Sequence, residues 1–167
     1  MWMIRIIQAD ITSLKVDAIV NAANESLLGG GGVDGAIHRV AGPELREFNK
    51  GLGGCRTGQA RLSPGFNLPC KWVISTVGPV WHGGDRGEAD LLESCYRQSL
   101  QLAVDNGVKT IAFPAISTGI YGYPKDAAAA IALTVMKEYE NILTEITACC
   151  FAAEDVDIYN RQLENTT

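Results

Sequence analysis

Short apolar runs alternate with longer amphipathic stretches along the chain of 167 residues. Runs rich in β-branched residues predict strands at residues 4–8, 17–20, 58–63, 71–77, 109–116 and 144–151. Apolar residues at helical spacing, bounded by Pro or Gly, predict helices at residues 33–41, 43–51, 91–106, 125–139 and 154–163. The alternation predicts a layered α/β domain with a largely parallel interior sheet. Strands near both ends of the chain are expected to add antiparallel edges.

The composition is that of one ordinary globular domain over residues 1–167, with 47% hydrophobic and 20% charged residues. The net charge is −5 at pH 7, and no basic cluster interrupts the acidic composition. We therefore expect no electrostatic binding to DNA, and no apolar run is long enough to cross a membrane. An anionic ligand would have to be held mostly by backbone amides and helix ends.

The cysteines are odd in number and form no C-x-x-C motif; they are Cys55, Cys70, Cys95, Cys149 and Cys150. The chain has only two histidines, so the spacing typical of a metal site is also absent. We expect reduced thiols, a cytoplasmic location, and neither a metal nor a cofactor.

Four consecutive glycines at residues 29–32 lie between a predicted strand and a predicted helix. Glycine adopts positive φ readily and lets a ligand approach the main chain, while the helix start presents free N–H groups and partial positive charge. No G-K-[ST] follows, and the match to G-x-G-x-x-G is a by-product of the glycine run. A glycine run alone is usually a flexible turn, but its place here, followed by Val33-Asp34-Gly35, favours an anion site.

A second loop, PAISTGIYGYP at residues 114–124, also leaves an apolar strand and enters a helix. It offers hydroxyl groups and unhindered amides at Ser117, Thr118 and Gly119, and an aromatic ring at Tyr121. Each loop alone is compatible with an ordinary connection. Parallel sheets bind ligands at the carboxyl ends of their strands, so the two loops together are suited to enclose a diphosphate.

Asp34 is the first candidate for chemistry. An isolated Asp at a helix start is usually a partner of the helix dipole, but beside a bound anion it is placed to orient or deprotonate a water. Asn24, near the glycines, is suited to read sugar hydroxyls, whereas Asn21 is expected to make local turn hydrogen bonds. His38, one helical turn after Asp34, is either a satisfied half-buried histidine or a partner of Asp34.

Asp10 follows the first predicted strand in the segment ADIT. It either caps a turn or accepts a hydrogen bond from an exocyclic amine. His82 lies in a predicted loop with no partner evident from the sequence. Because no G-x-S-x-G motif is present, a serine nucleophile is not favoured.

The segments ADIT, IVNAAN, GGGGVDGAIHRVAGP, TVGPVW and FPAISTGIYGYP resemble the macrodomain family. Within it they are most similar to the MacroD-type ADP-ribose hydrolases, in particular the single-domain bacterial O-acetyl-ADP-ribose deacetylases. The likeness covers nearly the whole chain. It implies a three-layer α/β/α sandwich around a mixed, largely parallel central sheet, with ADP-ribose in a cleft at the strand ends.

The resemblance implies an ADP-ribose site formed by Asp10, Ile11, Asn24, Gly32, Val33, Asp34, Ser117, Thr118, Gly119, Ile120, Tyr121 and Phe151. Asp10 would accept a hydrogen bond from the adenine amine, and Phe151 would pack near the adenine. Asn24 would hold the distal ribose, which Tyr121 would shield. Residues 117–121 would wrap the diphosphate, and residues 32–34 would border the diphosphate and the distal ribose.

The expected activity is metal-independent hydrolysis of an ester on the distal ribose, with Asp34, Asn24 and Tyr121 as catalytic residues. The substrate would be O-acetyl-ADP-ribose or a protein carrying mono-ADP-ribose on an acidic side chain. Asp34 would activate the attacking water. Two alternatives stay open: a non-catalytic reader of ADP-ribose, and a regulatory module that docks onto another protein. The carboxylate of Val33-Asp34-Gly35 favours the enzyme, because a reader does not need it.

Overall fold

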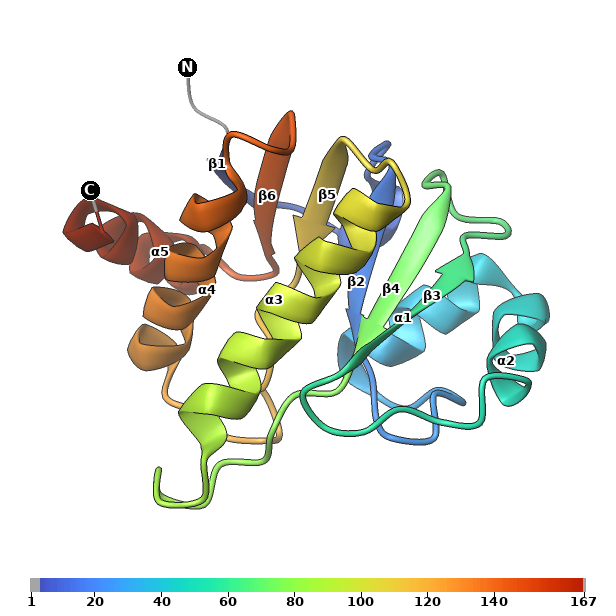
Figure 1. The fold of residues 1–167 in the computed structure, drawn as a ribbon, viewed down its shortest axis with the longest axis horizontal. Helices are drawn as coiled ribbons and strands as arrows, with labels where there is room; N and C mark the ends of the chain where they lie inside the picture. The colour runs from blue at the N-terminus through green and yellow to red at the C-terminus, as the bar shows by residue number, and fades with distance from the viewer. Residues whose placement is uncertain (1–3, 167) are drawn as a thin grey trace.

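The computed structural model describes residues 4–166, which form a six-stranded sheet in the order β1-β6-β5-β2-β4-β3. The strands are β1 (Ile4–Gln8), β2 (Ala18–Ala22), β3 (Ala60–Pro64), β4 (Trp72–Thr76), β5 (Thr110–Phe113) and β6 (Glu145–Cys150). The helices are α1 (Gly32–Ala41), α2 (Pro43–Lys50), α3 (Glu88–Asp105), α4 (Lys125–Tyr139) and α5 (Ala153–Thr166), with a 3-10 turn at Ile11–Ser13. Helices α3, α4 and α5 cover one face of the sheet and α1 and α2 the other, which confirms the three-layer sandwich (Figure 1).

One detail of the predicted sheet is wrong. The strands near the two ends of the chain, β1 and β6, pair in parallel, with Gln8 opposite Cys150. The antiparallel edge is instead β3, which pairs with β4. Only residues 65–71 separate these two strands, whereas a parallel pair needs a crossover of about a dozen residues or more. The short connection therefore forces β4 to run back alongside β3.

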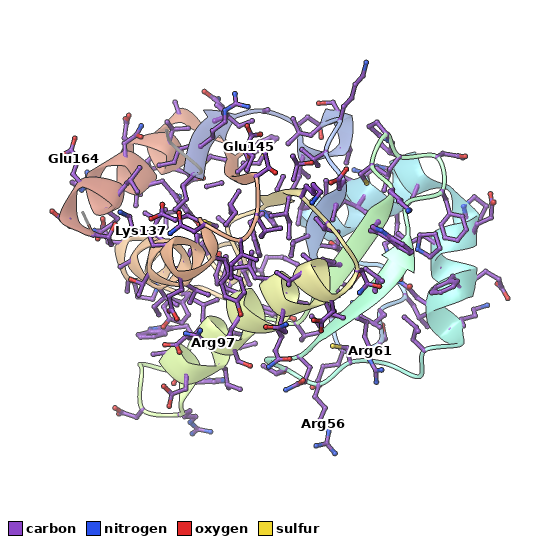
Figure 2. All side chains as sticks on the ribbon, turned by 45° about the horizontal axis from the view of Figure 1, so that its top comes forward. Arg56, Arg61, Arg97, Lys137, Glu145 and Glu164 are labelled. Atoms are coloured by element: carbon purple, nitrogen blue, oxygen red, sulfur yellow. The ribbon has the colours of Figure 1, made fainter. Side chains whose placement is uncertain are left out.

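Successive side chains of the inner strands enter two different cores. In β2, Ala18 and Val20 pack on the side of α3, α4 and α5, whereas Ile19 packs on the side of α1 and α2. Because helices bury both faces, these strands are largely apolar. Most charged side chains lie outside, where Arg97 pairs with residues of α3 and α4 and Arg56 points away from the ribbon (Figure 2); the buried exceptions among the described residues are Asp34 and Glu88.

The predicted helices are all present, and α4 has the predicted bounds. Helix α3 begins at Glu88, three residues before the predicted start at Leu91. The apolar spacing fails to mark this first turn, which carries the acidic residues Glu88 and Asp90. None of the described helices is both long and apolar enough to cross a membrane. All five cysteines are free thiols and are buried.

Candidate functional site

Four parallel strands direct their carboxyl ends to one edge of the sheet. The segments that follow β1, β2, β5 and β6 meet there with the first turn of α1, and they surround a cleft of about 740 Å³. The cleft walls include every residue expected around ADP-ribose, namely Asp10, Ile11, Asn24, Gly32, Val33, Asp34, Ser117, Thr118, Gly119, Ile120, Tyr121 and Phe151. The fold therefore brings these residues together, although they come from five separate stretches of sequence. Their individual roles stay predictions.

The side chain of Asn24 orders the loop that leads into the glycine run. Its Oδ1 accepts hydrogen bonds from the backbone N–H of Ser26 at 3.1 Å and of Leu27 at 3.2 Å, and from Ser26 Oγ at 2.6 Å. Its Nδ2 donates to the carbonyl of Gly29 at 2.9 Å. These bonds hold Leu27 at a positive φ of 64° with its side chain buried. Asn24 thus shapes the wall of the cleft.

The glycine run lies directly against the residues beneath it. A Cβ on Gly30 would stand 3.2 Å from Asp34 Oδ2 and 3.3 Å from Asn24 Nδ2. A Cβ on Gly35, within α1, would stand 2.5 Å from the carbonyl oxygen of Gly30. Gly32 adopts a positive φ of 58°. The close approaches explain the glycines at positions 30 and 35, and the positive φ explains Gly32. Residues 30–32 line the cleft at the start of α1.

Asp34 is a buried carboxylate at the base of the cleft, with only 4% of its surface exposed. Its Oδ1 accepts a hydrogen bond of 2.8 Å from Asn21 Nδ2 and lies 3.4 Å from His38 Nε2. Burial raises the pKa of Asp34 above its ordinary value, although the Asn21 amide and His38 act in the opposite direction. A carboxylate with a raised pKa is a stronger base than one in free solution.

This geometry tests the expectations for two neighbours of Asp34, namely Asn21 and His38. The expectation that Asn21 serves a local turn is wrong, because Asn21 lies inside β2, is fully buried and donates to Asp34. Of the two alternatives for His38, the structure supports the partner of Asp34. Its Nε2 is buried and makes no hydrogen bond to any described residue, and the carboxylate of Asp34 lies within ion-pair distance of it.

The second loop is bent and internally hydrogen-bonded. Ser117 has a positive φ of 67° and is buried, and its carbonyl accepts a hydrogen bond of 2.9 Å from the N–H of Tyr123. The Gly122 N–H donates to the Gly119 carbonyl at 3.0 Å. Ile120 at the tip is 97% exposed. The loop therefore lines the cleft and leaves its apolar tip exposed.

At the other end of the cleft, Asp10 caps the 3-10 turn. Its Oδ1 accepts hydrogen bonds from the N–H of Thr12 at 2.9 Å and from Thr12 Oγ1 at 2.6 Å. These bonds lower the pKa of Asp10. Among the described residues nothing donates to the other oxygen, Oδ2, so the cap leaves an acceptor for a ligand. Phe151 stands beside this end of the cleft with 89% of its surface exposed.

Sequence reasoning missed several residues of the cleft wall, among them Ala36, Arg39, Lys125 and Asp155. Two of them are cations, although Lys125 Nζ is paired with Asp155 Oδ1 at 3.1 Å. Ala36 and Arg39 are three residues apart on α1, and this helical spacing is the signal that would have found them. No group of three or more His, Cys, Asp or Glu side chains within residues 4–166 is arranged to hold a metal ion.

Comparisons with known proteins agree with this geometry. The sequence profile of the Macro domain matches residues 20–132. The Macro domain-containing protein CT2219 of Chlorobaculum tepidum is 60% identical over 164 residues, which cover 96% of this chain and 95% of that protein. The O-acetyl-ADP-ribose deacetylase of Enterobacter cloacae is 54% identical over 167 residues, covering 96% and 93%. A solved structure of an Oceanobacillus iheyensis macrodomain mutant with ADPR is similar at a TM-score of 0.91 and 40% identity, covering 96% of this chain and 91% of that one.

Proposed function

Because the chain belongs to the Macro domain family, we propose that its cleft binds ADP-ribose and that the protein hydrolyses an ester on the distal ribose. A structurally similar macrodomain was solved with ADPR, and a relative with 54% identity is an O-acetyl-ADP-ribose deacetylase. The cleft volume of about 740 Å³ is in the range of small-molecule sites.

In the proposed complex the diphosphate lies between the two loops, where backbone N–H groups and the start of α1 balance its charge. The free Oδ2 of Asp10 accepts a hydrogen bond from the adenine amine at one end of the cleft. The distal ribose lies at the other end, near Asn24, Asp34 and Tyr121, all of which line the cleft.

The proposed reaction is ester hydrolysis by a water bound at Asp34. The water oxygen adds to the ester carbonyl carbon while its proton passes to the carboxylate of Asp34. The bond between the carbonyl carbon and the ribose oxygen then breaks, and the ribose oxygen takes up the proton. The products are a carboxylic acid and ADP-ribose. General-base assistance of this kind contributes about 10²- to 10⁴-fold in rate.

The observation that carries the proposal is the buried carboxylate of Asp34, held by Asn21 under the glycine loop. We expect the change Asp34→Ala to retain ADP-ribose binding, measured by calorimetry, and to abolish acetate release from O-acetyl-ADP-ribose. Unchanged turnover would remove Asp34 from the mechanism. If the unaltered protein binds ADP-ribose but hydrolyses no ester, the protein is a reader of ADP-ribose.

A separate question is which ester is the physiological substrate. We propose to compare hydrolysis of O-acetyl-ADP-ribose, of a peptide with ADP-ribose on Glu and of a peptide with ADP-ribose on Ser. Both esters are expected to react. The Ser-linked peptide is expected to resist, because its bond to the ribose is an acetal-type linkage without a carbonyl carbon for the water to attack.

A further inference from the structure

Glu88 is a buried carboxylate outside the cleft, and the proposed reaction does not use it. It is the first residue of α3 and only 1% exposed. Among residues 4–166, the structure records no ion pair between Glu88 and a Lys or Arg side chain. An unpaired buried carboxylate is costly unless hydrogen bonds replace its water, so its surroundings require an explanation.

Backbone N–H groups of the preceding loop supply those hydrogen bonds. Oε2 accepts from His82 at 2.8 Å and from Gly84 at 3.1 Å, and Oε1 accepts from Arg86 at 2.7 Å. Burial by itself raises the pKa of Glu88, but these donors outweigh it and lower the pKa to about 2. The carboxylate therefore stays charged at physiological pH and fixes residues 82–86 around itself.

The loop held by Glu88 supports the second loop of the cleft. The N–H of Trp81 donates to the carbonyl of Tyr121 at 2.8 Å. The Trp81 ring packs against Tyr123 with centroids 4.7 Å apart. Tyr121 belongs to residues 117–121, which the proposed function places around the diphosphate, and Tyr123 follows in the same loop.

A further contact lies at Gly78, in the segment TVGPVW. A Cβ there would overlap Ser117 Oγ and come within 2.6 Å of Ile116 Cγ2. Ser117 is the residue that the second loop holds at a positive φ. The segment from Gly78 to Glu88 is thus in contact with both ends of the second loop.

We propose that Glu88 is a positioning residue for the diphosphate: its carboxylate fixes residues 82–86, and through Trp81 these hold the second loop in its ligand-binding conformation before the ligand arrives. This inference rests on the proposed function. A loop that is already in its binding conformation loses less conformational freedom on binding, which favours affinity. Asp34, Asn21 and His38 lie on β2 and α1 and make no contact in this chain of interactions.

The test compares Glu88→Gln with Glu93→Gln. Both changes remove one carboxylate from α3, but Glu93 is half-exposed and pairs with Arg97 at the surface. In Glu88→Gln a side-chain NH₂ group replaces one of the two carboxylate oxygens that accept from backbone N–H groups. At least one of the three hydrogen bonds is therefore lost. If the binding conformation falls to about a tenth of the population, the Kd for ADP-ribose rises about tenfold.

Four readouts separate positioning from general damage. We expect KM to rise about tenfold with kcat within about twofold, because in the substrate complex the second loop, Tyr121 included, is back in its binding conformation. The affinity for adenosine, which lacks the diphosphate, is expected to stay the same. Partial unfolding would instead lower the number of sites per molecule in calorimetry and leave the Kd unchanged. Amide hydrogen exchange is expected to accelerate at residues 82–86 and 119–123 while the middle of α3 stays protected.

Each outcome of the comparison between Glu88→Gln and Glu93→Gln supports or overturns the inference. If Glu88→Gln is folded and binds ADP-ribose within about twofold of Glu93→Gln, the inference is overturned. If Glu88→Gln does not fold, Trp81→Leu serves as the test, because it removes the ring that packs against Tyr123 and leaves the hydrogen bonds of the Glu88 carboxylate in place. An unchanged Kd of Trp81→Leu for ADP-ribose also overturns the inference. If the unaltered protein does not bind ADP-ribose, the proposed function fails, whereas the hydrogen-exchange comparison still tests the coupling between the two loops.

Discussion

The change Gly35→Ala tests whether the first glycine loop rests on α1 as tightly as the structure shows. Helix propensity alone predicts that this change stabilises the protein, because Ala is about 1 kcal/mol more favourable than Gly in a helix interior. The structure predicts the opposite sign. The new Cβ would stand 2.5 Å from the carbonyl oxygen of Gly30 and 3.1 Å from Arg39 Nη1. Because the two effects have opposite signs, the measured change in stability distinguishes them.

The magnitude follows from how far the loop has to move. Ordinary van der Waals contact begins at 3.4 Å, so the Gly30 carbonyl must retreat by 3.4 − 2.5 = 0.9 Å. Overpacking of this kind typically costs about 1–3 kcal/mol. After the gain of about 1 kcal/mol in helix propensity is subtracted, we expect a net destabilisation of up to about 2 kcal/mol. Gly30 lies against Asp34 and Asn24, so the shift also disturbs the proposed reaction centre.

The assay is urea unfolding of Gly35→Ala together with calorimetry against ADP-ribose. Gly51→Ala is the control, since Gly51 does not line the cleft, its φ is −69°, and its Cβ would stand at an ordinary contact distance of 3.4 Å from the Phe48 carbonyl oxygen. We expect the control to keep both its free energy of unfolding and its affinity. If Gly35→Ala is as stable as the unaltered protein and binds ADP-ribose equally well, the loop does not rest on α1 as described.

Three further predictions concern single side chains. Because the pKa of Asp34 is raised in the folded protein, its negative charge opposes folding at neutral pH. The change Asp34→Asn should therefore raise the melting temperature at pH 7. This gain should vanish as the pH falls toward 3.8, the ordinary pKa of Asp in the unfolded chain. Asn24→Ala removes the bonds that shape the loop and should cost about 1–3 kcal/mol in urea unfolding, with weaker ADP-ribose binding; equal stability would contradict the ordering role. The pKa of Glu88 is lowered from 4.5 to about 2, so it stabilises the fold above pH 4.5, and the stability difference between the unaltered protein and Glu88→Gln should shrink as the pH falls from 4.5 toward 2.

Much of the fold can be predicted from local sequence. The apolar runs of β2 and β5 identify buried strands, and the alanine-rich stretch of α4 defines a helix whose bounds match the prediction. Pro43 and Gly107 mark a helix start and a helix end because proline fixes φ and glycine adopts positive φ. These signals act within a few residues of each other, so no knowledge of distant contacts is needed to read them.

The partners of each strand depend on contacts between distant residues. The sequence does not reveal that β1 pairs with β6 across most of the chain, with Ile4 opposite Ile146. It also does not reveal the role of Asn21, because nothing local shows that β2 carries its amide to the carboxylate of Asp34.

The sequence by itself determined the elements, the two glycine-containing loops and the residues suited to a diphosphate and a catalytic water, because backbone preferences and side-chain chemistry are local properties. Only the tertiary structure decided which of these residues meet. It buried Asp34 and thereby raised its pKa, and it surrounded the buried Glu88 with three backbone donors from residues 82–86. Burial and hydrogen-bond partners depend on the packing of segments far apart in the chain, and a local pattern does not contain that information.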